Sequence, residues 1–230
     1  MDGTYTLIDR QGNWYAVDKS GLDKVTGICG NRIIAVKNNE YAVCSYDFNI
    51  ISEKFDEAYI SSNGTVTAKK NGKWALINAT DGSAVTDYLY DEVVLNSHNE
   101  VFAGKYGVVK DSQGYFVIDS TGKELNGVRY PGAKGFEGTY YAVSDAQSRW
   151  GYAGPSGEIT IGCRYDDAFS FSDNVGAVKK DGTWNYINSK GQLVIEGGFS
   201  DAHPFTNGYT FVTAGGEQKL ISFTYYTSFE

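Results

Sequence analysis

The 230-residue chain is poor in the residues that cross-link a fold or bind metals, with three cysteines, three prolines and two histidines. Cys29, Cys44 and Cys163 are odd in number and show no Cys-x-x-Cys spacing, so the sequence indicates neither a disulfide framework nor a zinc site. We expect the three thiols to act as small buried hydrophobes. On the same grounds we expect no metal and no cofactor.

Long apolar runs are also missing. No segment approaches the roughly 18 apolar residues of a membrane span, and residues 1–9 lack the basic and apolar regions of a signal peptide. We therefore expect no membrane insertion. A secreted protein from which the signal peptide has been removed shows the same pattern, so the sequence leaves the compartment open.

Basic residues are too few for nucleic-acid binding. The chain has 20 Lys and Arg against 28 Asp and Glu, a net charge of −8 and a pI near 4.8. Phosphate binding requires a basic face that displaces counterions. The composition therefore predicts no nucleic-acid partner.

Helix formers are scarce. There are 8 leucines against 32 valines and isoleucines, together with 18 tyrosines and 28 glycines. This balance favours half-buried strands, and no window of ten or more residues shows a 3.6-residue apolar period. At 41% hydrophobic residues the chain has enough apolar material for a core, and no linker divides it. We predict an all-β protein in which residues 1–230 form one repeat domain.

An internal repeat is the strongest signal in the sequence. Val175–Gly191 reads as a strand, a tight turn at Asp181-Gly182, a second strand and a glycine turn, and Val66–Asn78 repeats it almost letter for letter. The spacing between copies is 27 to 41 residues, mostly near 34. One aromatic landmark position, which contains all four tryptophans, recurs at Trp14, Tyr41, Trp74, Tyr115, Trp150 and Trp184, with Gln218 in a degenerate seventh copy.

A second aromatic landmark follows the first by 14 to 16 residues, at Phe55, Tyr90, Tyr130, Tyr165 and Phe199. Acidic pairs often follow it, as at Asp56-Glu57, Asp91-Glu92 and Asp166-Asp167. Neighbouring residues of a strand point to opposite faces, so these pairs do not supply the two carboxylates of a glycosidase. Because they recur, we interpret them as turn caps or local backbone acceptors.

These motifs resemble the WG-repeat family of bacterial β-rich repeats. The family unit reads approximately Gly-x-Trp-Gly-Leu-Ile-Asp-x-x-Gly, followed by a Tyr-Asp pair and a Phe-Ser-x-Gly turn into an apolar strand. Only Trp150 keeps the glycine that names the family, as Gly151, so the backbone approach should differ in the other copies. The resemblance implies binding or scaffolding, with no enzymatic activity to carry over.

A unit of about 34 residues supplies three or four short strands, so neighbouring units must share a core. We predict a small-bladed β-propeller of six to seven units, closed by pairing the strand-like segments 5–9 and 219–223. The alternative is an open β-solenoid of stacked hairpins. In either fold, the six aromatic landmarks are structural packing residues between units.

Departures from the repeat are the best functional clues, because folding requires only regularity. The interval from Trp74 to Tyr115 is seven residues longer than 34, with most of the excess in the segment 96–102. Other departures are the segment 129–132, which precedes a glycine-rich run, and the segment 203–205. The candidate binding residues are Asn96, His98, Asn99, Arg129, Tyr130, His203 and Phe205. We expect no catalytic residue.

The sequence thus predicts a non-enzymatic binding or scaffolding module that recognises a protein or a glycan. We expect a monomer, displayed extracellularly or on the cell surface of a bacterium, with a cytoplasmic location left open. One alternative is a glycan-active enzyme on a propeller scaffold, and another is a structural spacer domain.

Overall fold

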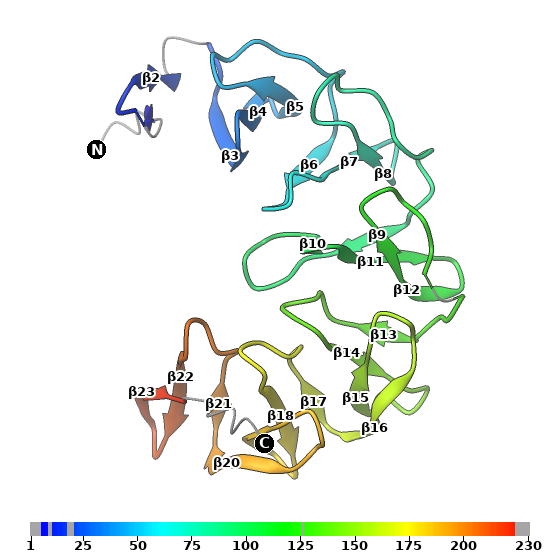
Figure 1. Ribbon diagram of the computed structural model, residues 1–230, viewed down its shortest axis with the longest axis vertical. Coiled ribbons are helices and arrows are strands. Elements are labelled where there is room, and N and C mark those ends of the chain that lie inside the picture. The colour runs from blue at the N-terminus through cyan, green and yellow to red at the C-terminus, as the bar shows by residue number, and fades with distance from the viewer. Residues whose placement is uncertain (1–5, 9–10, 18–20, 126, 224–230) are drawn as a thin grey trace, which may run out of the picture.

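A computed structural model describes residues 6–8, 11–17, 21–125 and 127–223. Its regular structure consists of seven small antiparallel sheets, which we number blades 1 to 7 in chain order. The blades follow one another around an open arc, with blade 1 (blue) and blade 7 (red) at its two ends (Figure 1). The predicted all-β propeller architecture is confirmed.

Each blade is a meander of neighbouring strands, and most blades begin with a short strand. By blade, the strands are β1 (Thr6–Ile8) and β2 (Trp14–Ala16); β3 (Lys24–Cys29), β4 (Arg32–Lys37) and β5 (Glu40–Ser45); β6 (Glu57–Ile60), β7 (Val66–Lys70) and β8 (Lys73–Ile77); β9 (Glu92–Val94), β10 (Phe102–Ala103), β11 (Tyr106–Asp111) and β12 (Gly114–Asp119); β13 (Gly132–Ala133), β14 (Tyr141–Ser144), β15 (Trp150–Ala153) and β16 (Ile159–Tyr165); β17 (Asp167–Ala168), β18 (Gly176–Lys180), β19 (Thr183–Ile187) and β20 (Leu193–Phe199); and β21 (Asp201–Ala202), β22 (Tyr209–Ala214) and β23 (Glu217–Ser222).

The first aromatic landmark occupies the same place in every blade, the strand that follows the central hairpin turn. Trp74 lies in β8, Trp184 in β19, and the degenerate Gln218 in β23. The second landmark pairs with it across the sheet, as in Trp74 with Tyr90 and Trp184 with Phe199. A sequence unit from one landmark to the next therefore begins in one blade and ends in the following blade.

The acidic residue after the second landmark caps the hairpin turn of its own blade. Asp56 Oδ2 accepts a hydrogen bond from the backbone N–H of Asn71 at 3.0 Å, and Asp166 Oδ2 accepts one from Gly182 at 3.4 Å. Asp91 instead forms an ion pair with Lys73 of the preceding blade. The predicted backbone-acceptor role is thus confirmed for Asp56 and Asp166.

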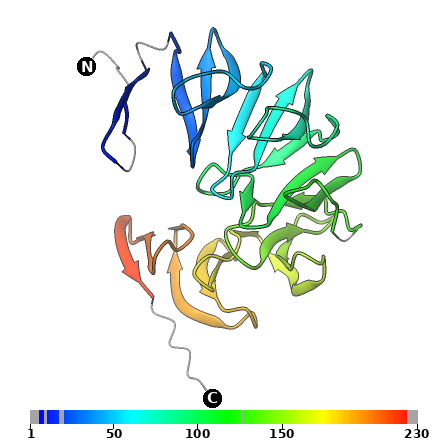
Figure 2. The same cartoon turned by 45° about the horizontal axis from the view of Figure 1, so that its top comes forward.

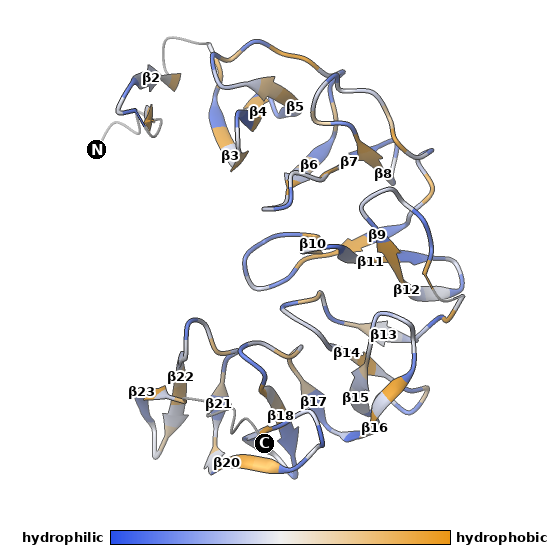
Figure 3. Cartoon of the chain, in the orientation of Figure 1, coloured by the Kyte–Doolittle hydropathy of each residue, from blue (hydrophilic) through white to orange (hydrophobic). Residues whose placement is uncertain are grey.

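The apolar core lies between blades. Side chains of successive residues point to opposite faces, so each blade has a leading face toward the preceding blade and a trailing face toward the following one. In β8, for example, Ala75 and Ile77 pack toward blade 2, whereas Trp74 and Leu76 pack toward blade 4. Six such clusters join the seven blades in sequence, and apolar residues recur along their strands (Figure 3).

The predicted closure by pairing of the terminal strands is wrong. Within the described residues, β1 pairs with β2 alone and β23 pairs with β22 alone, and the two end blades stand apart in both views (Figures 1 and 2). Whether the two ends meet depends on the sum of the angles between blades, which the packing of the six clusters sets. Tyr5 and Asp9, which bounded one predicted strand, lie outside the described residues.

The packing role predicted for the tryptophans holds for three of the four. Trp74 and Trp184 are each 5% exposed, and Trp150 is partly buried against the cluster between blades 5 and 6. Trp14 is 73% exposed, so its predicted packing role is wrong. In its described residues, blade 1 has two strands and buries Leu7 against blade 2, which leaves the opposite face of the hairpin, with Trp14, in solvent.

The Trp150-Gly151 pair shows why glycine follows the landmark in blade 5. A Cβ atom on Gly151 would lie 2.4 Å from the carbonyl oxygen of Ile161 and 2.7 Å from the backbone nitrogen of Cys163. In blade 6, Asn185 occupies the equivalent position, and its Oδ1 accepts hydrogen bonds from the backbone N–H groups of Gly197 and Gly198. The strand register across this bulge is nevertheless the same in both blades, with Tyr152 opposite Ile161 and Tyr186 opposite Ile195, so the expected difference in backbone approach is not seen in the pairing.

Replacing Gly151 with alanine should destabilise the protein by about 1–3 kcal/mol, because the neighbouring backbone of β16 must shift to admit the methyl group. Urea unfolding monitored by tryptophan fluorescence would measure the loss. Gly162→Ala, in the same strand pair, is the matched control, because a Cβ there meets no atom within 4 Å. A G151A variant as stable as G162A would contradict the packing explanation.

Candidate functional site

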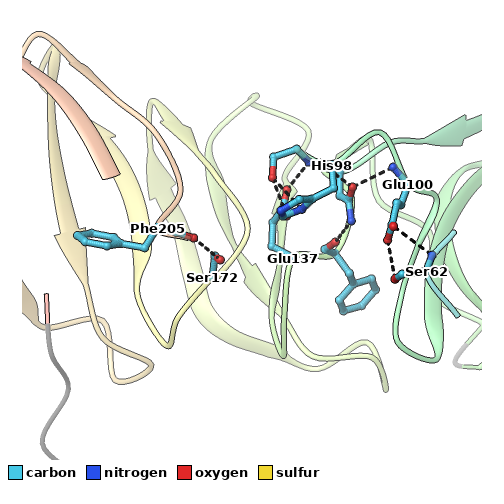
Figure 4. Close-up of polar contacts among 9 residues, drawn as sticks. Ser62, His98, Glu100, Glu137, Ser172 and Phe205 are labelled. Carbon is cyan, nitrogen blue, oxygen red and sulfur yellow. Dashed lines mark hydrogen bonds and ion pairs between the residues drawn. The ribbon is translucent and has the colours of Figure 1, made fainter. Parts of the chain in front are cut away.

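Most of the candidate residues lie in one set of loops, which we call the rim loops. Each connects the first strand of a blade to the next strand, at residues 61–65, 95–101, 134–140, 169–175 and 203–208 of blades 3 to 7. The longest departure from the repeat, residues 95–101, separates β9 from β10, and both strands pair with β11. Figure 4 shows the polar contacts among these loops.

Asn96 organises its own loop. Its Oδ1 accepts hydrogen bonds from the backbone N–H groups of His98 at 2.9 Å and Glu100 at 3.0 Å. Its Nδ2 donates to the carbonyl oxygen of Phe136 in blade 5 at 3.2 Å. The amide thus folds the loop and holds it to the next blade, which leaves little of its hydrogen-bonding capacity for a ligand.

A serine–glutamate clamp joins successive rim loops. Glu137 accepts hydrogen bonds from the backbone N–H of Ser97 at 2.6 Å and from its hydroxyl at 2.9 Å, and its side chain is only 7% exposed. Glu100 accepts the same two bonds from Ser62, at 3.0 and 2.9 Å (Figure 4). The clamp therefore recurs between blades 3 and 4 and between blades 4 and 5.

Glu137→Ala should lower the free energy of unfolding by about 1–3 kcal/mol, because it leaves a backbone N–H and a hydroxyl without their acceptor. Chemical denaturation would measure the change. Glu196→Ala in β20 removes an exposed carboxylate and should stay within about 0.5 kcal/mol of the parent. Equal stability of the two variants would show that the clamp contributes nothing.

The Arg129 side chain binds other residues of the fold. Its guanidinium bonds Asp111 Oδ2 at 2.9 Å and Glu124 Oε1 at 2.7 Å, and it lies 3.6 Å from the centre of the Phe116 ring. Hydrogen bonds from Arg129 hold the pKa values of both carboxyl groups below their usual range, and the bonds to Glu124 raise the pKa of the arginine. This cation is therefore already neutralised.

Two candidates are core residues, so the expectation that they contact a partner is not supported. Tyr130 is 8% exposed and donates its hydroxyl to the carbonyl oxygen of Gly157 at 2.8 Å. Phe205 is 1% exposed and packs edge-on against Tyr186. Both occupy repeat positions, at which the aromatic ring fills the space between blades.

His98, Asn99 and His203 remain exposed. The His98 side chain is 55% exposed with Nδ1 3.4 Å from Glu137 Oε2, and that of His203 is 54% exposed with Nε2 3.5 Å from Asp201 Oδ2. Asn99 lies at the tip of its loop with a positive φ of 59°. The structure does not bring the two histidines together, since blades 5 and 6 separate their rim loops.

Stability that depends on Arg129 should depend on pH. Because the folded pKa values of Asp111 and Glu124 are lowered, their contribution is present above the unfolded pKa values and is lost as pH falls through the folded values. Arg129→Met should cost about 1–3 kcal/mol near pH 7, and this cost should shrink progressively as pH falls below about 4 through the lowered pKa values. Urea unfolding at pH 7 and at several pH values below about 4 would test this, and a pH-independent difference would contradict it.

One cavity was missed by sequence reasoning. It has a volume of about 390 Å³ and lies between the rim loops of blades 5 and 6, with Ser189 at its border. Its lining residues are Gly138, Thr139, Tyr140, Phe171, Asp173, Asn174 and Ser189. The only sequence signal was the glycine-rich run 132–138, because nothing marks two loops of different units as neighbours.

The walls of this cavity are held in place. The backbone N–H of Phe171 donates to the carbonyl oxygen of Tyr140 at 3.0 Å, and the two rings meet edge to face with centroids 5.5 Å apart. Asp173 Oδ2 accepts a hydrogen bond from the backbone N–H of Gly208 at 2.7 Å. Asp173 and Asn174 both adopt positive φ, which fixes the tight turn.

Several polar groups of the cavity have no hydrogen-bond partner in the part of the chain that the structure describes. Among the described residues, the Tyr140 hydroxyl, the Asn174 amide and the Ser189 hydroxyl form no hydrogen bond. By contrast, Asn96 and Glu137 form hydrogen bonds across the contact between the rim loops of blades 4 and 5. The cavity thus combines an aromatic wall with donors and acceptors open to a ligand.

Two other hollows lie elsewhere. One of about 660 Å³ lies where blades 1 and 2 meet, and one of about 280 Å³ borders β19 and β20. The first is lined by Ile8, Gln11, Tyr15, Ile28, Gly30, Asn31 and Tyr46. The second is lined by Arg164, Tyr165, Val178, Lys180, Asn185, Ile187, Gly191 and Leu193.

The three cysteines are free; Cys44 is buried, whereas Cys29 and Cys163 are only partly buried. Burial raises the pKa of the Cys44 thiol to about 11. In the part of the chain that the structure describes, no three His, Cys, Asp or Glu side chains gather where they could hold a metal ion. The described residues also contain no helix long and apolar enough to cross a membrane.

The family comparison matches the sequence repeat. The model described as "WG containing repeat" matches three stretches of the chain, residues 44–74, 150–184 and 186–217. The first and second stretches end at landmark tryptophans, Trp74 and Trp184. No curated protein matches the chain.

Solved structures agree on the fold. The computationally designed Ika8 protein matches with a TM-score of 0.54 and 14% identity over 88% of this chain and 71% of its own. BamB from Moraxella catarrhalis matches with a TM-score of 0.51 and 14% identity over 96% and 79%. Hsv2 from Kluyveromyces lactis matches with a TM-score of 0.50 and 9% identity over 84% and 71%. At these identities, the likeness concerns the propeller architecture alone.

Proposed function

We propose that this chain, a run of WG-containing repeats on a propeller-like scaffold, is a non-enzymatic binding module whose ligand site is the cavity between the rim loops of blades 5 and 6. The observation that carries the proposal is the cavity itself, which combines the Tyr140 and Phe171 rings with the side chains of Asp173 and Asn174. Its volume of about 390 Å³ lies within the usual range of ligand pockets, about 300–1,000 Å³.

The ligand class proposed is a neutral sugar unit of a glycan. The apolar face of a sugar ring stacks on aromatic side chains, and its hydroxyl groups need both donors and acceptors. Tyr140 offers the ring, while Asn174, Ser189 and the second oxygen of Asp173 offer the polar contacts. The net charge of −8 disfavours an anionic glycan.

A binding role fits this cavity better than glycoside hydrolysis or a purely structural spacer role. Glycoside hydrolysis usually uses two carboxyl groups about 5–9.5 Å apart, and Asp173 is the one carboxylate among the described lining residues. A pure spacer would need no concave surface with unpaired polar groups. Recognition of a glycan by a bacterial binding module also fits the extracellular or cell-surface location expected from the sequence, which is part of this proposal.

Glycan-array screening of the intact chain, followed by titration calorimetry on the best sugar, tests the site. Tyr140→Leu should weaken binding by about tenfold or more, because it removes the stacking surface. Asn174→Gly should also weaken it while preserving the turn, since Gly208 occupies the equivalent position in blade 7.

His98→Ala in the rim loop of blade 4 serves as the control and should bind like the parent chain. Loss of binding in H98A with normal binding in Y140L would move the site to residues 95–101. No binding to any glycan of a broad array would count against the sugar proposal as a whole.

A further inference from the structure

Blade 7 exposes an apolar face whose counterpart in blade 6 is covered. Tyr209, Phe211 and Leu220 are 56%, 49% and 59% exposed, and Phe211 pairs directly with Leu220 across β22 and β23. Residues on the other face of β22, such as Val212, are buried against blade 6. The exposed residues therefore form the trailing face of blade 7.

The repeat shows what such a face contacts elsewhere. Tyr209, Phe211 and Leu220 are equivalent to Val175, Ala177 and Tyr186 of blade 6, which are 2%, 1% and 0% exposed. In blade 6 these three residues pack on blade 7 through the cluster that contains Val212. The trailing face of blade 7 thus has the composition of a blade interface, and no further blade covers it among the described residues.

The polar contacts of the interface between blades 6 and 7 also have no counterpart on blade 7 among the described residues. Ser172 donates to the carbonyl oxygen of Phe205 at 2.6 Å (Figure 4). Asp173 accepts from the backbone N–H of Gly208, so both side chains connect blade 6 to blade 7. The blade 7 equivalents are Thr206 and Asn207. Among the described residues, neither side chain forms a hydrogen bond.

The other end of the arc is apolar as well. Ile8 and Trp14 pair across β1 and β2 and are 51% and 73% exposed, whereas Leu7 faces blade 2. Next to them lies the hollow of about 660 Å³ that Ile8 helps to line. The two end blades stand apart in the ring (Figure 2), so neither face covers the other.

We propose that these two faces bind each other between copies, with blade 7 of one chain docked on blade 1 of a second copy of this chain. Six packed interfaces set the curvature of the arc, and closing it within one chain would require all of them to shift, because close-packed cores resist continuous deformation. A second copy supplies the missing neighbour without such a change. The proposal replaces the expectation of a monomer.

The contact is head to tail, because it joins two different surfaces of the chain. Pairing through the open edge of β23 is a poorer route, since Glu217 and Lys219 place charges along that strand. The exposed side chains are few, and a contact below about 1,200 Å² is typical of weak association. Assembly should therefore increase with concentration.

Sedimentation velocity of the intact chain over about a hundredfold range of concentration tests the proposal. We expect the average mass to rise with concentration for the parent chain. The Phe211→Thr/Leu220→Thr double variant and the Trp14→Thr variant should each stay monomeric, and circular dichroism would verify their fold. Leu193→Thr, an equally exposed leucine (55%) in β20, is the matched control and should associate like the parent.

Mixing the two variants decides the geometry. The F211T/L220T chain keeps its blade 1 face and the W14T chain keeps its blade 7 face, so the mixture should form a one-to-one dimer that grows no further. A parent chain that stays monomeric at every concentration would overturn the proposal, as ring closure or a further blade of a longer protein would predict. Dimers of W14T alone would also overturn it, by showing that two blade 7 faces pair.

Discussion

The packing of side chains between neighbouring blades is the constraint on which this structure depends. In these three- and four-stranded sheets, successive side chains point to opposite faces, and both faces are apolar. Such a sheet can bury both faces only between two similar sheets. Trp74 and Leu76 pack on one side of β8 while Ala75 and Ile77 pack on the other. Each blade is therefore stabilised by its neighbours, and the six clusters, rather than any single sheet, form the core.

The sequence predicts the parts of this fold that are local and repeated. The Asp181-Gly182 turn, the landmark strands and the capping role of Asp166 follow from short motifs whose physical meaning does not depend on the rest of the chain. The outcome for Trp14 could not be predicted, because its flanking residues match the other copies, whereas its exposure is decided by which face of a two-stranded blade meets blade 2. The prediction of ring closure also failed because closure is not a local property. It depends on the sum of the angles between blades.

The candidate site shows a similar limit. Departures from the repeat marked Asn96, Arg129 and Phe205, and the structure uses all three side chains within the fold, as a loop organiser, an ion-pair centre and a core ring. A polar or aromatic residue required for packing cannot be distinguished from one that awaits a ligand without knowing its neighbours. The cavity beside Tyr140 and Asn174 arises from two loops of different units, about 30 residues apart, and neither loop is unusual by itself.

The offset between sequence units and blades has a consequence for how such chains evolve. A unit from one landmark to the next, such as Trp150 to Trp184, carries the closing strand of one blade and the opening strands of the next. Tandem duplication of that stretch would insert a new blade whose opening strands come from one copy of the stretch and whose closing strands come from the next. Proteins of this construction can therefore gain or lose length in whole modules, and the number of modules sets the span of the arc.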